Sequence, residues 1–212
     1  MAAEALFLLA DAAYRADNYS ESASLYQLLM ERFPDDRRAT ESKLQAAWSL
    51  YREGKHADAL EMARDATEGV DGPLSADWLY LRANAERKTG EKRASIGTYD
   101  RLLGAFPANR VSAGAAYEQL LLFFGEGEYE KISERGPQLV PAPDVREDYL
   151  WLMAESFAQL KRDEDALQAF ESLASEFPDA DRAADAIFRQ ARVLQNGKDA
   201  AAAVLMYDLV AA

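Results

Sequence analysis

The chain has 212 residues, of which 49% are hydrophobic, with 7 prolines and 11 glycines, so it can form a sizeable core or an extended array and is not expected to be disordered. Its 24 basic and 37 acidic residues give a formal charge of −13, which repels a phosphate backbone and disfavours nucleic acid as a partner. There is no cysteine and only one histidine, His56, which excludes disulfides, thiolate metal sites and histidine clusters.

The first segment, residues 1–19, reads MAAEALFLLADAAYRADNY. Its apolar stretch is too short to span a bilayer, and it lacks the basic start and small-residue cleavage site of a signal peptide. We therefore expect a helix here, without a signal peptide or membrane insertion. The last residues, AAAAVLMYDLVAA, stop within an apolar helical run, so we expect the chain to be a piece of a longer protein.

Turn signals recur about every 34 to 37 residues between these ends, a period typical of stacked helix pairs. The aligned turns are RADNYSESASLY, REGKHADALEMA, KTGEKRASIGTY, GEGEYEKISERG, LKRDEDALQAFE and QNGKDAAAAVLMY. The chain is rich in Ala, Leu, Glu and Arg, which favours helix over strand. The spacing predicts an all-α array of six antiparallel helix pairs over residues 3–36, 37–73, 74–108, 109–143, 144–179 and 180–212.

Small residues recur where two helices must approach closely. In the first helix of each pair they are Ala10, Ala47, Ala83, Ala154 and Ala191, with Leu120 as the exception. In the second helix they are Ser22, Ala59, Ser95, Ala166 and Ala203, with Ile132 as the exception. Later in the second helix come the aromatics Tyr26, Tyr99, Phe170 and Tyr207, replaced by Ala63 and Gly136 in pairs two and four. The second helices end at Pro34, Pro107 and Pro178, with Pro73 and Pro141 displaced.

This pattern resembles the tetratricopeptide repeat family over nearly the whole chain, with the fourth pair as its least typical member. The resemblance implies an α-solenoid with a right-handed superhelix, in which the first helix of each pair (helix A) lines the concave face. Asp or Asn follows the Phe-Pro closures in DDRR, ANR and DADR, and we expect these side chains to cap the next helix.

The fourth pair contains SERGPQLVPAPDVRED. Gly136-Pro137 predicts an early end of its second helix, and Pro141 and Pro143 predict an extended segment after it. Two interpretations remain open: a kink or hinge in the array, or an ordinary loop in which Leu139 and Val140 pack on neighbouring helices.

Motifs for nucleotide binding, serine hydrolysis and zinc proteolysis are absent. We expect His56, in the turn REGKHADA, to face solvent, because no cysteine or second histidine can complete a nucleophile–base set. Asp179, Asp181 and Asp185 lack the glycine and the terminal glutamate of a calcium loop and are expected to be helix-start carboxylates. We therefore expect no catalytic residue, metal or cofactor; a hydrolase built on two carboxylates is the least favoured alternative.

In tetratricopeptide repeats, partners bind at inward positions of the A helices. The resemblance assigns these partner-binding residues: Tyr14, Arg15, Trp48, Tyr51, Arg52, Tyr80, Asn84, Arg87, Lys88, Tyr117 and Trp151. The same register adds Phe7, Asp11, Leu44, Leu121, Phe124 and Glu155. Aromatic rings beside arginine are the composition of binding hot spots. The alternative is that many of these rings pack between the A and B helices.

The family's tail-binding members use paired Lys and Asn on successive A helices as a carboxylate clamp. Only Arg52, Asn84, Arg87 and Lys88 match parts of it, and repeat one has Asp11 and Arg15 instead, so this clamp is not expected.

These observations predict a non-catalytic interaction scaffold that binds a protein, as a peptide or a partner helix, through the concave A-helix face. The closures RFP, AFP and EFP are similar to those of bacterial cell-envelope repeat proteins, which implies a role in envelope assembly, in the periplasm or envelope, with the cytoplasm as the alternative. A second hypothesis is a self-assembly module that forms a homodimer through its open C-terminal repeat.

Overall fold

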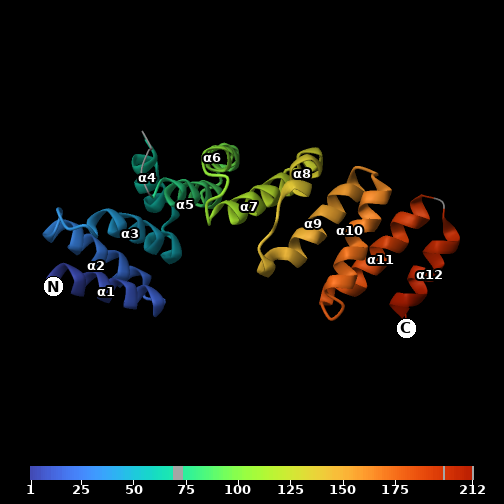
Figure 1. Ribbon diagram of the computed structural model, residues 1–212, viewed down its shortest axis with the longest axis horizontal. Helices are drawn as coiled ribbons and strands as arrows, with labels where there is room; N and C mark the ends of the chain where they lie inside the picture. Colours follow the sequence, from blue (N-terminus) through green and yellow to red (C-terminus); the bar gives the residue numbers. More distant parts are fainter. Residues whose placement is uncertain (69–73, 198, 212) are drawn as a thin grey trace. The chain divides into compact units, whose positions relative to one another are not determined.

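The computed structural model describes residues 1–68, 74–197 and 199–211, and these residues form twelve α-helices, two short 3-10 helices and no β-strand (Figure 1). The predicted all-α class is therefore confirmed. Two compact units divide the chain, residues 1–115 and 116–212. Pro73 lies outside the described residues.

The first unit is a succession of helices in which each packs against the next one along the chain, from α1 to α6 (Figure 1). Short turns within each pair make its two helices antiparallel. The helices are α1 (Ala2–Arg15), α2 (Tyr19–Arg32), α3 (Ala39–Glu53), α4 (His56–Thr67), α5 (Ser75–Lys88) and α6 (Lys92–Ala105). Helix α7 (Ser112–Gly125) begins in this unit and ends in the second.

The second unit continues with α8 (Tyr129–Arg135), the 3-10 helices η1 (Gly136–Gln138) and η2 (Pro143–Val145), and then α9 (Arg146–Gln159), α10 (Asp163–Glu176), α11 (Asp181–Asn196) and α12 (Ala200–Ala211). From α8 to α12, each α-helix packs against the next one along the chain. None of the helices in the described residues is both long and apolar enough to cross a membrane.

The predicted close-approach positions are all buried. Each of the ten small residues is at most 3% exposed, and Leu120 and Ile132 are buried as well. Hydroxyl groups fit these contacts because they find partners there: Ser95 Oγ donates to the carbonyl of Ala83 at 2.7 Å, and Ser22 Oγ lies 3.0 Å from Ser49 Oγ. Tyr26, Tyr99 and Phe170 are also buried, whereas Tyr207 is half-buried.

In the first five repeats, the turn between the two helices contains one residue with a left-handed backbone. Gly54, Gly90 and Gly127 take this position with φ of 91°, 87° and 72°, respectively. In repeats one and five the equivalent residues are Asp17 and Lys161, with φ of 58° and 56°. Side chains are disfavoured in this conformation because Cβ crowds the following carbonyl, so these two turns retain local strain.

The Asp and Asn side chains that were expected at the helix starts accept hydrogen bonds from backbone N–H groups just before the helices begin. Asp36 Oδ1 accepts a hydrogen bond from the backbone N–H of Arg38 at 2.9 Å, and Asn109 Oδ1 accepts one from Val111 at 3.1 Å. Both donors precede the first helical residue, so these side chains close Asx turns that lead into α3 and α7. Asp36 and Asn109 therefore do not bond the unpaired N–H groups of the helix, whereas Asp181 lies in the first turn of α11, as expected for a helix-start carboxylate.

The fourth repeat has a short second helix, as its Gly-Pro pair predicts. Helix α8 has only seven residues and ends at Arg135. Gly136 is buried, and a Cβ built there would lie 2.2 Å from Met153 Sδ, so only glycine fits unless Met153 moves. In the connector that follows, Leu139 is half-buried and Pro141 is buried, but Val140 is 83% exposed. The packed-loop interpretation therefore holds for Leu139 and not for Val140.

Candidate partner-binding surface

The predicted binding residues of the first unit lie at helical spacing on their A helices. Trp48, Tyr51 and Arg52 share one face of α3, and Tyr80, Asn84 and Arg87 share one face of α5, since spacings of three, four and seven residues return to the same side of a helix. We define the first-unit surface as the side chains at these positions on three helices: Tyr14, Arg15, Trp48, Tyr51, Arg52, Tyr80, Asn84, Arg87 and Lys88.

A series of ring contacts joins α3 and α5 and their neighbours. The centroid of Trp48 lies 5.6 Å from that of Tyr51 and 6.0 Å from that of Tyr80. Tyr51 contacts the ring of His56 at 4.9 Å, and Tyr80 contacts Tyr99 at 6.4 Å. Trp48, Tyr51 and Tyr80 are half-buried. These rings thus pack between helices, as the alternative interpretation holds, and still present part of their area to solvent.

His56 is half-buried rather than solvent-facing, because Tyr51 covers one side of its ring. Burial lowers the pKa of His56 below its usual value of 6.5, and the nearby Lys88 ammonium lowers it further. At neutral pH the imidazole of His56 is therefore mainly in its neutral form.

The predicted cations differ in how far they are already engaged. Arg15 pairs with Asp11 at 2.6 Å, and Arg52 donates a hydrogen bond to Tyr19 Oη at 2.8 Å while it lies over the Tyr19 ring. Lys88 is exposed, and among the described residues it makes no hydrogen bond or ion pair. It is therefore better placed than Arg15 or Arg52 to meet a carboxylate of a partner.

A second ring pair, formed by Tyr14 near the end of α1 and Tyr19 at the start of α2, lies beside Arg52 near the end of α3. Tyr14 contacts Tyr19 at 5.3 Å between centroids. Burial raises the pKa of Tyr14, and the positive charge of Arg52 opposes that rise. This cluster fixes Arg52 against the first repeat.

Several predicted residues are buried and offer little area to a partner. Asn84 is 5% exposed and uses its Nδ2 to donate to the carbonyl of Tyr80 at 2.8 Å. Leu44 and Tyr117 are 3% and 8% exposed. Burial raises the pKa of Tyr117 to about 12, and the Asp148 carboxylate adds to this rise. Asn84 therefore supports the first-unit surface from beneath, and Tyr117 is a buried residue of the second unit.

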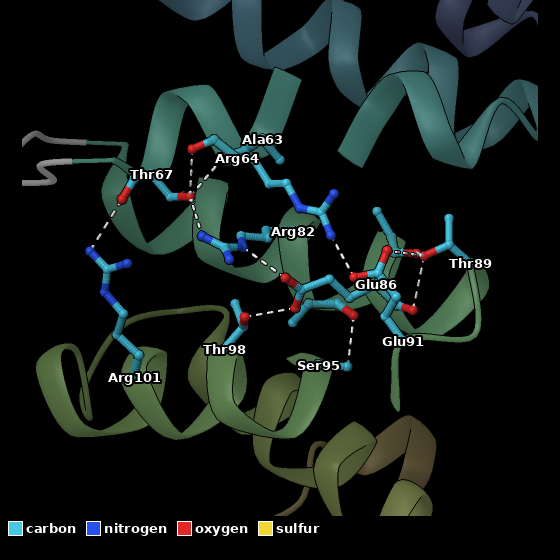
Figure 2. Close-up of polar contacts among 12 residues, drawn as sticks. Ala63, Arg64, Thr67, Arg82, Glu86, Thr89, Glu91, Ser95, Thr98 and Arg101 are labelled. Carbon is cyan, nitrogen blue, oxygen red and sulfur yellow. Dashed lines mark hydrogen bonds and ion pairs between the residues drawn. The ribbon is translucent and has the colours of Figure 1, made fainter. Parts of the chain in front are cut away.

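Helix α5 is anchored on its other side by a polar network that the sequence analysis missed (Figure 2). The Glu86 carboxylate is fully buried and accepts hydrogen bonds from Arg82 Nε at 2.8 Å and from Thr98 Oγ1 at 2.6 Å. Arg82 also donates to Thr67 Oγ1 at 2.9 Å. Figure 2 shows these groups joining α4, α5 and α6. The network holds the helix that carries Tyr80 and Lys88 in a fixed rotation.

In the second unit, Trp151 is the centre of a mixed aromatic and charged cluster. The ring is half-buried and contacts Phe170 at 5.8 Å. The guanidinium groups of Arg182 and Arg189 on α11 lie 5.7 and 5.9 Å from its centroid. The two arginines were not predicted, because only the packing of α11 against its neighbours brings them to this ring.

Both arginines are held by carboxylates of α9. Arg182 forms an ion pair with Asp148, and Arg189 Nε lies 3.2 Å from Glu155 Oε1. Beside this cluster, α9, α10 and α11 enclose a recess of about 500 Å³. Neither here nor elsewhere in the described residues is a group of three or more His, Asp or Glu side chains placed to hold a metal ion.

Models of a known repeat family match the chain over the same repeats. A tetratricopeptide repeat model matches residues 44–110, and a second model of that repeat matches residues 4–36 and 148–180. The chain belongs to the tetratricopeptide repeat family. The unmatched stretches include the fourth tetratricopeptide repeat, in which α8 is short and Leu120, Ile132 and Gly136 depart from the pattern.

Solved tetratricopeptide repeat structures share the fold. A tetratricopeptide repeat protein from Parabacteroides merdae is 18% identical, covers 98% of this chain and 78% of its own, and has a TM-score of 0.68. MamA from Desulfovibrio magneticus is 14% identical, covers 80% of this chain and 92% of its own, and has a TM-score of 0.64. No curated protein sequence matches the chain.

Proposed function

We propose that the chain is a non-catalytic scaffold that binds a partner protein, as an extended peptide or a helix, through the first-unit surface. Membership of the tetratricopeptide repeat family supports an interaction scaffold, since stacked repeats expose a long surface for their mass. We propose a protein rather than a nucleic acid as the partner, because the formal charge of −13 repels a phosphate backbone.

The observation that carries the proposal is the contact of Trp48 with Tyr80 across two A helices, of which α5, the helix of Tyr80, ends at the exposed Lys88. The two ring centroids are 6.0 Å apart, and both rings are half-buried. Aromatic side chains provide large contact area at low entropic cost, and Lys88 adds a charge for a carboxylate. Because the Arg82–Glu86 network fixes α5 from behind, this surface is already organised before a partner arrives.

The partner should be recovered by affinity capture from the native organism, identified by mass spectrometry, purified, and titrated against variants. We expect Trp48→Ala, Lys88→Glu and Arg87→Glu each to weaken binding by about 1 to 4 kcal/mol. Lys88→Glu gives the clearest test of the three, because Lys88 is exposed and its replacement should change binding without changing the fold, whereas Arg87 is half-buried.

Arg93→Glu on α6 is the matched control, since Arg93 is exposed outside the first-unit surface. It should bind the partner as the wild-type chain does. If Lys88→Glu and Trp48→Ala both retain wild-type affinity at low salt, where charge contacts are least screened, the first-unit surface is not the binding site.

We further propose that the protein acts in bacterial cell-envelope assembly and is located in the periplasm or the envelope. Its support is the similarity of the Phe-Pro closures at Pro34, Pro107 and Pro178 to those of cell-envelope repeat proteins. Cell fractionation with an antibody to the chain tests it: recovery from the cytoplasmic fraction alone would contradict this location.

Self-assembly is a second candidate, because one side of α12 carries apolar residues without cover. Val204, Leu205 and Leu209 are 56%, 63% and 59% exposed, and clustered apolar exposure favours association. Light scattering should then show a homodimer that Leu205→Glu or Leu209→Glu dissociates, while Ala184→Glu, at an exposed position of α11, leaves it intact. A wild-type chain that is monomeric at high concentration would exclude this candidate.

A further inference from the structure

The connector between α8 and α9 is a proline-rich segment outside the first-unit surface (Figure 1, between α8 and α9). Residues 137–144 read PQLVPAPD, and they lie within the second unit. Four of them, residues 139–142, form the stretch between the 3-10 helices η1 and η2. We call residues 137–144 the proline connector.

The backbone of the proline connector has the conformation of a polyproline II helix. Leu139 has φ of −90° and ψ of 142°, and Ala142 has φ of −62° and ψ of 150°. These angles are closer to those of polyproline II, about −75° and about 145°, than to those of a β-strand. The sequence favours this conformation, because the ring of Pro141 fixes its φ, and because Val140 and Ala142 each precede a proline, which disfavours helical angles.

Hydrogen bonds hold the proline connector at both ends. Tyr149 Oη on α9 donates to the carbonyl of Gly136 at 2.8 Å, and the N–H of Leu139 donates to the same carbonyl at 2.9 Å. At the other end, the N–H of Val145 donates to the carbonyl of Ala142 at 3.1 Å. The segment is therefore held in shape before a partner arrives, which reduces the entropic cost of binding.

One edge of the proline connector is apolar and faces solvent. A polyproline II helix has three residues per turn, so Val140 and Pro143 lie on the same edge. Val140 is 83% exposed, more than any other large hydrophobic side chain of the described residues except Met1, and Pro143 is exposed too. Pro141, which lies on another edge, is buried. The connector thus presents a valine and a proline to solvent, one turn apart.

The backbone polar groups of the proline connector are also unengaged. Within the described part of the chain, the N–H groups of Val140 and Ala142 and the carbonyls of Val140 and Pro141 make no hydrogen bond. A polyproline II segment has no internal hydrogen bonds, so its carbonyls can accept them from a partner. Indole N–H and phenol O–H groups are suitable donors, and their rings also provide large apolar area for a valine and a proline.

A negative charge next to the apolar edge adds a preference about the partner. Asp144 is exposed, and it makes no hydrogen bond or ion pair with another described residue. Its carboxylate directly follows Pro143 in the sequence. A lysine or arginine at the rim of a partner's binding groove would therefore find an unpaired carboxylate beside the apolar edge.

We infer that the proline connector is a docking segment for a partner protein domain whose groove is lined by aromatic side chains and has a cation at its rim. The rings pack against Val140 and Pro143 and donate hydrogen bonds to the free carbonyls, while the cation pairs with Asp144. Proline-rich segments in this conformation dock into aromatic-lined grooves in general. The inference goes beyond the proposed scaffold function, since here this chain supplies the bound segment and the partner supplies the groove.

The test uses the full chain and a minimal probe of such a groove, acetyl-Trp-Lys-Trp-amide. Its match, acetyl-Leu-Lys-Leu-amide, has the same charge and no ring. The methyl NMR signals of Val140 report binding, and those of Leu8 on α1, which is 60% exposed, report non-specific stacking. We expect the Trp probe to shift the Val140 signals saturably and to bind about tenfold more tightly than the Leu probe, because its rings supply both apolar area and hydrogen-bond donors.

Variants locate the contact. Val140→Asn should lower the affinity for the Trp probe about tenfold, because it removes the exposed apolar side chain, and the signals of Ala142 then report binding. Pro143→Ala should lower it about threefold, because it removes the ring and the fixed φ. Val204→Asn, the matched change at a valine of α12 that is 56% exposed, should leave the affinity unchanged.

Three results overturn the inference. The first is a Val140 signal that stays still up to about 20 mM Trp probe, a concentration at which even weak specific contacts are occupied. The second is equal affinity for the Leu probe, or an equal response of Leu8. The third is equal affinity of the Trp probe for the wild-type chain and Val140→Asn. The first-unit surface fails separately, because its tests, Trp48→Ala and Lys88→Glu, change no residue of the proline connector.

Discussion

The residue with left-handed backbone in the turn of each of the first five repeats affects the free energy of unfolding, because a side chain is strained there and glycine is not. Lys161 occupies with a side chain the conformation that Gly90 occupies without one, at φ of 56° and 87°. We predict that Lys161→Gly stabilises the chain by about 0.5 to 1 kcal/mol, because relief of the αL strain exceeds the added flexibility of glycine in the unfolded chain. Urea unfolding measures this difference.

Gly90→Ala is the reciprocal control. A Cβ at Gly90 meets nothing within 4 Å, so any loss of stability comes from the backbone conformation alone, and we expect about 1 kcal/mol. A destabilised Lys161→Gly beside an unaffected Gly90→Ala would show that this position is not strained.

His56 predicts a pH dependence of stability. Burial, and then Lys88, lower its pKa in the folded chain, so below about pH 6.5 the unfolded chain binds more protons than the folded one. The contribution of His56 is therefore complete above this pH and decreases as the pH falls toward the folded pKa. His56→Phe keeps an aromatic ring against Tyr51, and it should lose less stability than the wild-type chain between about pH 7.5 and about pH 5.5. Equal losses in the two proteins would contradict this prediction.

The helical elements were predictable because their causes are local. Periodic apolar positions and the small residues fixed the existence and pairing of the helices, and the Gly136-Pro137 pair fixed the end of α8 at Arg135. The capping role of Asp36 could not be read correctly, because a shift of two residues moves its carboxylate from the helix to the turn before it.

Ala83 illustrates how the elements depend on close approach. It is fully buried on α5, and its carbonyl accepts the hydroxyl of Ser95 on α6. We predict that Ala83→Leu overpacks this contact and destabilises the chain by about 1 to 3 kcal/mol in thermal or urea unfolding. Ala94→Leu is the control, because Ala94 is exposed on α6 and should tolerate the larger side chain. An unchanged thermal midpoint for Ala83→Leu would mean that α5 and α6 separate easily.

The candidate sites were only partly predictable. The repeat register located Trp48, Tyr80 and Trp151 on their A helices, since Tyr80 and Trp151 lie three residues before a small residue of known role and Trp48 directly follows one. Arg182 and Arg189 could not be assigned, because many arginines follow the same helical spacing and only packing selects those that meet the Trp151 ring.

At the scale of the whole molecule, the excess of acidic residues acts against the folded state. A formal charge of −13 brings like charges together on folding, and this repulsion is screened by salt. We predict that the thermal midpoint rises between about 20 mM and about 300 mM sodium chloride. The ion pairs between neighbouring repeats, such as Arg38–Glu4 at 3.6 Å, weaken in the same experiment but are individually small. A falling midpoint would show that such pairs outweigh the net repulsion.

The Glu86 network also bears on how a chain of similar repeats avoids stacking in the wrong order. Every repeat has a comparable apolar face, so a helix pair that skipped its neighbour during folding would still bury much of its surface. Arg82, however, reaches Thr67 of the preceding repeat, while Glu86 needs both Arg82 and Thr98. A misassembled array would keep the Arg82–Glu86 and Glu86–Thr98 contacts, which lie within repeat three, and would lose the Arg82–Thr67 hydrogen bond, at a cost of about 1 to 3 kcal/mol. The hydrogen bond from Arg82 to Thr67 thus favours the correct succession of repeats two and three over an array in which another repeat takes the place of repeat two.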